Sequence, residues 1–455
     1  EPAVISFVRR ESGLEFAHYG KPFTSNSLES LIKQTSSKVR TDIKTVGKYG
    51  TGFLVTHQFG RIIHLSGLLQ VVDNEELFYP FSDLKLDRSF EDKDLLKESL
   101  KEQSREVNSW GFDSALLTGN AHGKTVFRYE AQYEAESDAL KRAFETPYVL
   151  ALNCRYIQEI GFRDEITGSE RRFRLGEYVE KPISEGRTYL LKRTDVYEID
   201  RDKTYTIFTL SSKTIDERVN DSNVTVILPV ETDGECFRTA LLDEKLAKLY
   251  LSLPLIGTEK WGLNLIIHSP LFECENDSRS SLRIVPQGLG LPENDNKQML
   301  ECAYQMVEEW MNNSLEQIKE RKHLGRVCFD NTSKNQAVAD FHEGLQRKWV
   351  RLMATSPIAL NNDKIYKKPQ DLYVVDEHLT EYASENGNFR KAIYEVLLKR
   401  YTALMPEYSD FLFWSRQINQ WRTGGDECHV LCIEDVVKTI ESLNWNESEN
   451  GIPEE

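Results

Sequence analysis

The sequence predicts a mixed α/β protein (α+β in its chain order), with strands through about two thirds of its length and helices after them. Short β-branched and aromatic runs separated by polar turns recur through residues 1–290, a pattern typical of strands. From residue 296 onward, apolar residues recur at helical spacing. Apolar residues make up 40% and charged residues 29% of the chain, which excludes a mainly disordered or collagen-like protein.

The first 135 residues alternate strand and turn signals around one helix, which predicts a mixed, mostly antiparallel sheet. Residues 9–13 have the composition of a hairpin turn. Residues 25–33 carry Leu28, Leu31 and Ile32 at helical spacing, with Ser or Thr available as a cap. Residues 86–108 are so highly charged that they form either a solvated helix or a mobile segment. The expected strands are residues 4–8, 14–17, 61–65 and 124–129.

The rest of the chain divides into a strand-rich part and a helical part. We expect a short helix over residues 139–144 before the strands begin again. The expected strands are residues 204–210, 224–229 and 263–268, and the expected helices are residues 297–322, 336–353, 388–404 and 433–443. These patterns predict three domains, at residues 1–148, 149–292 and 293–455.

Charge and composition limit the partners and the setting of the chain. The 57 basic and 73 acidic residues give a net charge of −16, which disfavours nonspecific nucleic-acid binding. Residues 319–326 form the one dense basic run, which we interpret as a solvated helix end. The chain has no apolar run approaching the ~20 residues of a membrane helix, and residues 1–4 do not look like a signal peptide.

The seven cysteines are odd in number and widely scattered, which favours a reducing, cytoplasmic setting over a disulfide framework. Cys428, His429 and Cys432 have side chains that bind metals, but the second half of a paired zinc motif is missing. They also stand in an apolar stretch. We therefore favour buried strand residues over metal ligands.

A glycine cluster, Val46-Gly47-Lys48-Tyr49-Gly50-Thr51-Gly52-Phe53, is the most informative feature for function. Glycines at this spacing allow positive φ and let the backbone approach a ligand closely. A helix beginning just after them would direct free N–H groups at a phosphate. The spacing matches neither the Walker pattern nor the dinucleotide fingerprint. Taken alone, the cluster is more often a structural turn.

Three further motifs accompany the glycine cluster in a fixed order. They are His18-Tyr19-Gly20-Lys21-Pro22-Phe23, then Ser36-Ser37-Lys38, then the strand at residues 123–127. The set resembles the GHKL (Bergerat-fold) ATPases, a group that includes heat-shock chaperone, mismatch-repair and gyrase-type ATPases. The sacsin-like branch is closest in character, because there an HxG-x-PF element replaces Asp-x-Gly-x-Gly. The resemblance covers residues 1–135 well, residues 150–290 weakly, and little beyond.

The resemblance implies a Bergerat-type ATP-binding sandwich, then a transducer-like α/β domain and a mainly helical region, with ATP and Mg²⁺ as cofactors. Gly20 would lie near the base and sugar, and Thr125 would hydrogen-bond the adenine. The alternative for Thr125 is an ordinary β-branched strand residue. Ser37 and Lys38 would lie near a lid over the phosphates. The remaining implied nucleotide-binding residues are Gly47, Lys48, Gly50, Thr51, Gly52 and Phe53.

Residues 223–229 followed by residues 271–279 resemble the transducer domain of sacsin-like proteins. In that domain a Phe-to-Arg element returns a cation toward the γ-phosphate, so Arg279 is the implied sensor. Arginine suits this role because its planar fork binds two phosphate oxygens. The alternative is a surface arginine in a polar turn.

Two departures from the family pattern affect catalysis and specificity. The Glu-x-x-x-Asn helix, which activates water and holds magnesium, does not precede the first strand of this sequence. Either an upstream segment lies outside the sequence, which we favour, or the protein lacks the hydrolytic apparatus. His18 stands where the family has an acidic adenine-binding residue.

The resemblance predicts an ATP-binding, ATP-hydrolysing conformational switch that couples lid and domain closure to a protein partner. The expected settings are chaperone-like function or antiviral defence against phage, with a homodimer as one assembly. The alternatives are a catalytically inactive nucleotide-binding scaffold and a nucleic-acid clamp of the mismatch-repair type. Asp340 and His342 lie close in sequence on an expected helix, and we regard them as solvated or packed rather than catalytic.

Overall fold

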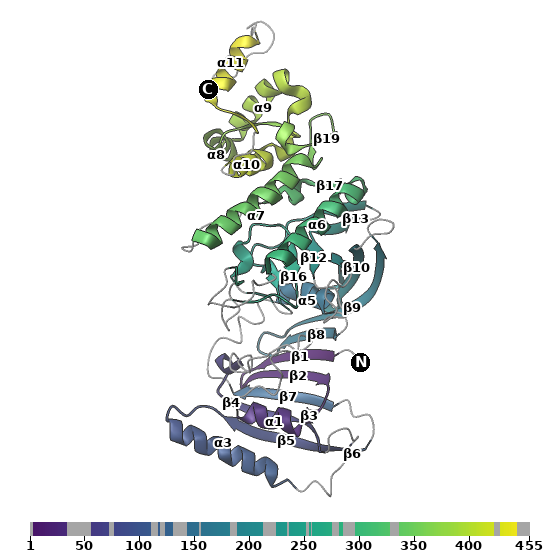
Figure 1. The fold of residues 1–455 in the computed structure, drawn as a ribbon, viewed down its shortest axis with the longest axis vertical. Coiled ribbons are helices and arrows are strands. Elements are labelled where there is room, and N and C mark those ends of the chain that lie inside the picture. The colour runs from purple at the N-terminus through teal and green to yellow at the C-terminus, as the bar shows by residue number, and fades with distance from the viewer. Residues whose placement is uncertain are drawn as a thin grey trace.

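The molecule is elongated, with a long sheet at its N-terminal end and helices at its C-terminal end (Figure 1). The computed structural model describes residues 3–33, 56–71, 77–110, 117–118, 123–130, 143–153, 156–182, 189–212, 224–233, 236–251, 254–255, 257–274, 282–284, 296–327, 336–422 and 428–443. This arrangement of a large mixed sheet and C-terminal helices confirms the predicted fold class.

The N-terminal half of the sheet is built almost entirely from antiparallel pairs. The sheet order here is β1-β2-β7-β4-β5-β6, and only β3 pairs in parallel, with β4. The predicted hairpin is present, with its turn at residues 11–12. The strands are β1 (Ala3–Arg10), β2 (Gly13–Gly20), β3 (Phe23–Thr24), β4 (Ile62–Gln70), β5 (Leu77–Asp87), β6 (Leu117–Thr118) and β7 (Gly123–Glu130).

Two helices cover one face of this half. Helix α1 (Ser25–Ile32) begins where the Thr24 side chain accepts a hydrogen bond from the Ser27 backbone. Helix α3 (Lys93–Asn108) is capped by Asp92, so the helical alternative for the charged segment is correct. Leu28 and Ile32 of α1 pack on strand residues that alternate toward the helices. Those strand residues include Leu14, Ile63, Leu65, Phe127 and Tyr129.

The sheet continues without a break into the second half, because β1 pairs in parallel with β8. The order then runs β8-β9-β10-β11-β12-β16-β15. A separate sheet of order β13-β14-β17 lies beside it. Of the helix expected over residues 139–144, residues 139–142 lie outside the described residues, and residues 143–144 belong to a 3₁₀ turn (Ala143–Glu145). The helix α5 (Thr146–Leu152) follows this turn, and Pro147 suits its start. The strands are β8 (Ile157–Asp164), β9 (Ser169–Pro182), β10 (Tyr189–Glu198), β11 (Lys203–Ser212), β12 (Thr225–Leu228), β13 (Val230–Asp233), β14 (Cys236–Thr239), β15 (Leu249–Tyr250), β16 (Ile266–His268) and β17 (Ile318–Glu320).

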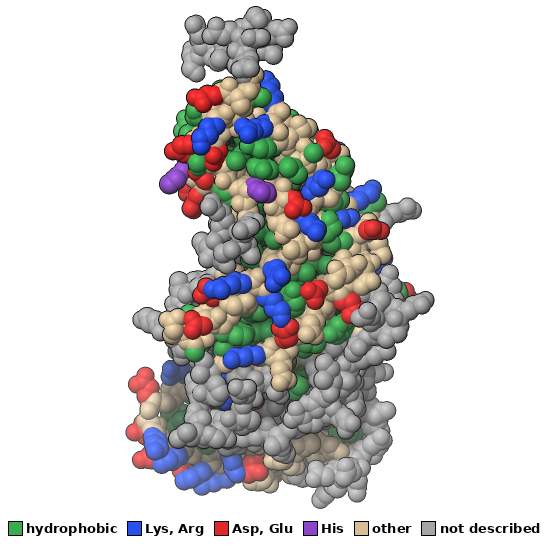
Figure 2. All heavy atoms as spheres, turned by 45° about the horizontal axis from the view of Figure 1, so that its top comes forward, with side chains coloured by type: hydrophobic (Ala, Val, Ile, Leu, Met, Phe, Trp, Pro, Cys, Tyr) green, Lys and Arg blue, Asp and Glu red, His purple; other side chains and the backbone are tan. Residues whose placement is uncertain are grey.

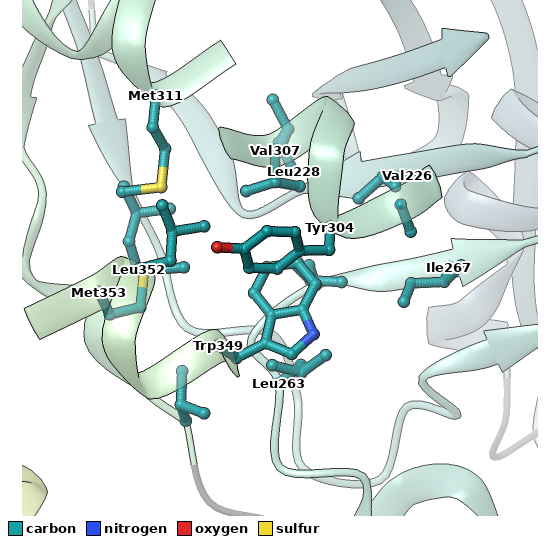
Figure 3. Close-up of a cluster of buried hydrophobic side chains, with 14 of the residues drawn as sticks. Val226, Leu228, Leu263, Ile267, Tyr304, Val307, Met311, Trp349, Leu352 and Met353 are labelled. Atoms are coloured by element: carbon teal, nitrogen blue, oxygen red, sulfur yellow. The ribbon is translucent and has the colours of Figure 1, made fainter. Parts of the chain in front are cut away.

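The C-terminal helices pack on this second half and on each other. Trp349 of α7 meets Tyr304 of α6 over the sheet residues Val226, Leu228 and Ile267 (Figure 3). The helices are α6 (Asn296–Ser314), α7 (Gln336–Thr355), α8 (Glu377–Glu385), α9 (Gly387–Tyr401), α10 (Phe411–Arg422) and α11 (Ile433–Ser442). Short strand pairs join them: β18 (Ala359–Leu360) with β19 (Tyr366–Lys367), and β20 (Tyr373–Val375) with β21 (His429–Leu431).

The helix predicted over residues 297–322 is too long, and the interpretation of the basic run as a solvated helix end is wrong. Helix α6 ends at Ser314, and the chain then forms β17, which pairs with β14. Arg321, within the run, is only 8% exposed. Its guanidinium donates to the Ile318 and Pro357 carbonyl oxygens and lies 3.9 Å from the Tyr366 ring centre.

The predicted domain boundaries are crossed by shared structure. One sheet passes the first boundary at β1 and β8, and one hydrophobic core contains residues on both sides of the second. Residues 429–431 form β21, as expected, but the His429 side chain is exposed and stacks on Tyr373 at 4.5 Å. Within the described ranges, no three His, Cys, Asp or Glu side chains gather to hold a metal. None of the described helices combines the length and apolar character that crossing a bilayer requires.

Candidate functional site

Three strands of the N-terminal half bring small and polar residues together on the helix-covered face. His18 of β2 lies directly opposite Thr125 of β7. An added Cβ on Gly67 of β4 would lie 3.4 Å from the Thr125 Oγ1 atom, so Gly67 is the next neighbour. Thr125 shares its face with Phe127 and Tyr129, which pack in the core beneath α1. We call His18, Thr125 and Gly67 the polar rung.

Aromatic side chains frame the polar rung. The Phe16 ring lies 5.7 Å from the His18 ring and 5.8 Å from Phe127. The Phe23 ring lies 6.1 Å from Phe81 and 6.4 Å from Phe127. An added Cβ on Gly67 would also lie 3.6 Å from Phe81. Because glycine has no side chain, the backbone of β4 can be approached closely at this point. The arrangement suits a flat, partly apolar group with a polar edge.

The polar groups of the rung retain hydrogen-bonding capacity. Thr125 is only 2% exposed, and its hydroxyl makes no hydrogen bond to another described residue. Burial lowers the pKa of His18, so its imidazole is neutral near pH 7. A neutral imidazole donates from one nitrogen and accepts at the other. The rung therefore offers both donors and acceptors to a bound molecule.

Both flanks of the glycine segment lie on this same face. Helix α1 ends at Ile32, whose carbonyl oxygen accepts a 2.7 Å hydrogen bond from the buried Arg88. The described chain resumes at Thr56, whose side chain hydrogen-bonds to the hydroxyl of Tyr129 in β7. Burial raises the pKa of Tyr129 to about 12, so its phenol stays protonated. The described residues on either side of residues 34–55 thus both lie on the helix-covered side of the sheet.

The structure describes two of the predicted site residues, and both belong to this face. Thr125 lies in β7, and Gly20 ends β2 opposite Gly123. Gly67 was not among the predicted site residues, although it is a glycine inside an apolar strand. The predicted residues that lie outside the described ranges are Ser37, Lys38, Gly47, Lys48, Gly50, Thr51, Gly52, Phe53 and Arg279.

The opposite face of the same strands carries a charged cluster instead. The His64 ring lies 2.9 Å from an Asp83 oxygen through Nδ1 and 2.8 Å from a Glu130 oxygen through Nε2. Arg128 donates to Asp83 at 2.9 Å. These side chains are about half exposed, apart from the more buried His64. We interpret this face as a solvated surface rather than part of the candidate site.

No protein-family model and no curated protein matches the chain. Among solved structures, the chain is similar to the ATP-binding domain of topoisomerase IV from Francisella tularensis. The identity is 15%, over 37% of this chain and 75% of that one, with a TM-score of 0.19. It is also similar to the B-subunit of DNA gyrase from Myxococcus xanthus. That identity is 8%, over 67% and 83% of the two chains, with a TM-score of 0.29. At these scores the likeness does not establish a shared family, and function must be argued from the residues.

Proposed function

We propose that the N-terminal half of the protein binds ATP at the polar rung. The observation that carries the proposal is the position of the rung: buried polar groups with free hydrogen-bonding capacity lie on the face where the glycine segment begins and ends. Adenine is flat and has both an acceptor and a donor on one edge. Thr125 and neutral His18 match such an edge, and the neighbouring phenylalanines match its apolar faces.

In this proposal the glycine segment holds the phosphates. Gly47, Gly50 and Gly52 allow close approach of the backbone, and free N–H groups at a helix start favour an anion. Lys38 and Lys48 supply positive charge, while Ser37 and Thr51 supply hydroxyl donors. The neighbouring Phe53 and Gly20 complete the proposed set. A bound Mg²⁺ would neutralise charge on the phosphates.

We further propose that nucleotide binding changes the relation between the two halves of the molecule. Strand β1 supports this coupling, because it pairs with β2 on one side and with β8 on the other. Arg279 is the proposed γ-phosphate sensor, and the C-terminal helices are the proposed contact for a protein partner or client. A chaperone-like or anti-phage role of the sacsin-like type and a homodimer belong to the same proposal.

The proposal is primarily one of ATP binding, and ATP hydrolysis is its second part. The three described residues of the polar rung include no carboxylate that could serve as a general base, so a catalytically inactive nucleotide-binding scaffold is the second candidate. A nucleic-acid clamp is less favoured because the net charge is −16. On the face drawn in Figure 2, basic and acidic side chains alternate over the described surface.

Calorimetric titration of ATP, with and without Mg²⁺, tests the proposal. A valine at Gly67 would project toward Thr125 and Phe81, so Gly67→Val should weaken ATP binding at least tenfold. The matched control is Gly161→Val in β8, where an added Cβ meets only the Arg172 side chain, at 3.4 Å. Gly50→Val or Gly52→Val should abolish binding. Equal affinities for the wild type and Gly67→Val would refute a base site at the rung.

A further inference from the structure

A cavity of about 220 Å³ lies in the second half of the molecule, away from the polar rung. Its floor is one line of residues across four strands. Val179 of β9 pairs with Arg193 of β10, Arg193 with Phe208 of β11, and Phe208 with Leu228 of β12. Helix α6 and the small sheet supply the other walls, through Trp310 and Ile318. The cavity therefore belongs to the fold itself rather than to a single loop.

The walls of the cavity are mainly apolar and well packed. Phe208, Leu228, Trp310 and Ile318 are each less than 8% exposed. The Phe237 ring meets the Phe208 ring edge to face at 5.3 Å, which holds both in place. An apolar cavity of ~150 Å³ is already large enough for a benzene-sized molecule and holds water poorly. This cavity therefore suits a small apolar ligand.

Arg193 is the one charged side chain among the residues described as lining the cavity, and it sits on the same line as exposed Val179. Its guanidinium is half exposed and meets Asp195 at 3.4 Å, with a hydrogen bond at the long limit of 3.5 Å. Asp195 also accepts a 2.8 Å hydrogen bond from the Thr206 hydroxyl, so it keeps a partner if Arg193 turns away. Arg193 thus has donors available for an anionic group at the mouth of the cavity.

We propose that this cavity binds a small carboxylic acid with an apolar body, of the medium-chain fatty-acid class. The apolar chain occupies the space between β11, β12 and α6, and the carboxylate pairs with Arg193. The size of the cavity limits the chain length, and the single guanidinium selects an acid over an amine. The site is separate from the proposed ATP site, so each stands without the other.

Calorimetry with octanoate, octan-1-ol and octylamine tests the class of ligand. Octanoate should bind most tightly, octan-1-ol about tenfold more weakly, and octylamine more weakly still, because a charge-assisted pair is lost and then replaced by repulsion. Octanoate should also raise the melting temperature. Equal affinities for the three compounds would refute the role of Arg193, and absence of binding by all three would refute the site.

Two pairs of variants locate the binding. Arg193→Gln should reduce octanoate affinity about tenfold, to the level of octan-1-ol. Arg174→Gln in β9, which removes a similarly exposed arginine paired with Glu159, should have no effect. Val179→Trp should block the cavity mouth without disturbing the core, because Val179 is 66% exposed. Glu180→Trp, on the opposite face of the same strand, is its control. Full octanoate binding by Val179→Trp would place the ligand elsewhere and overturn the proposal.

Discussion

The two halves of the large sheet differ in what covers them. In the second half, β12 and β16 are buried on both faces, with α6 and α7 packed against Val226 and Ile267, and α5 packed against Ile227 and Ile266. The N-terminal half has described helices on one face only, and its other face carries half-exposed charges. Even its covered face is interrupted by the polar rung. The strands at the centre of the second half are therefore packed on both sides, whereas the N-terminal half places small and polar groups on its covered face.

Side-chain size accounts for much of this difference. In the second half, aliphatic side chains of β12 and β16 lie around Tyr304 and Trp349 (Figure 3). In the N-terminal half, the corresponding surface is a threonine, a glycine and a half-buried histidine. Apolar groups of a packed surface are buried when the protein folds, and this burial stabilises the fold. Groups of a binding surface are buried only when the ligand binds, so their burial contributes to affinity instead. We therefore expect the halves to respond differently to mutation.

The largest expected effect is in the second half. Trp349 is fully buried, and its ring lies 5.3 Å from Tyr304. Trp349→Ala should lower the free energy of unfolding by about 3–5 kcal/mol, because it leaves a cavity that the sheet cannot close. Phe23→Ala beside the polar rung should cost less than half as much, because Phe23 is only partly buried. Urea unfolding measures both, and equal losses would contradict the comparison.

A smaller loss is expected where the two helices of the N-terminal half are joined. Arg88 is 5% exposed and donates to the Ile32 carbonyl oxygen and, at 2.6 Å, to the Gln103 side chain. Burial lowers the pKa of Arg88 to about 10, which leaves it charged at neutral pH. Arg88→Leu should cost about 2–3 kcal/mol, because two buried acceptors lose their donor.

Arg88→Lys keeps the positive charge but lacks the planar guanidinium that reaches two acceptors at once. It should therefore recover only part of the stability that Arg88→Leu loses. Since Ile32 ends the helix before the glycine segment, ATP affinity should fall together with stability in Arg88→Leu. Unchanged affinity in this variant would mean that the position of α1 does not matter for the candidate site.

A pH-dependent effect of about 2 kcal/mol is expected from the second half. Burial lowers the pKa of His268 to about 4, and its Nδ1 atom is buried without a partner in the described part of the chain. Between pH 6.5 and 4 the unfolded chain binds a proton that the folded chain does not. Stability is therefore lost as pH falls through this range. The full shift would give more, but the residue as a whole is only partly buried.

His268→Leu should flatten this part of the stability profile relative to the wild type. Burial also lowers the pKa values of His18, His57 and His323, so the wild-type profile contains several contributions. Only the difference between variant and wild type isolates His268. Parallel profiles from pH 4 to 6.5 would show that its protonation is not linked to folding.

Local patterns were enough to predict the hairpin, the first helix and the strand at β7, because each has its own periodicity and cap. The end of α6 was not predicted, because β17 depends on pairing with the distant β14. Helix α10 was not predicted, although Trp414, Ile418 and Trp421 stand at helical spacing and are fully buried on one face of it. Helix α8 was also not predicted.

The candidate site was also only partly predictable from the sequence, because it depends on strand pairing between distant segments. Thr125 was selected by resemblance, and the structure places it opposite His18 on the helix-covered face. Gly67 joins them only through the pairing of β4 with β7, which is not visible in sequence. The glycine cluster and Arg279 lie outside the described residues and stay predictions.

The smallest effect is expected on the exposed face of the N-terminal half, at Asp83. Its φ of 63° is in the left-handed region, where β5 loses register with β4 near Gly67. Its backbone N–H donates to the Ser66 hydroxyl at 3.0 Å, and its carboxylate meets His64 and Arg128. Asn tolerates left-handed φ nearly as well as Asp, so Asp83→Asn removes the charge alone. We expect a loss within about 0.5 kcal/mol, because the pairs are exposed to solvent.

Asp83→Val separates backbone geometry from charge, because a β-branched residue at this φ should cost a further 1–2 kcal/mol or so. A double-mutant cycle of Asp83→Asn with Arg128→Gln should give a coupling energy below about 0.5 kcal/mol that shrinks with added salt. A coupling above about 1.5 kcal/mol, insensitive to salt, would mean that this face is shielded from water in solution. The two halves would then be covered alike, and the open face of the N-terminal half would have to be assigned to a contact that the single chain does not contain.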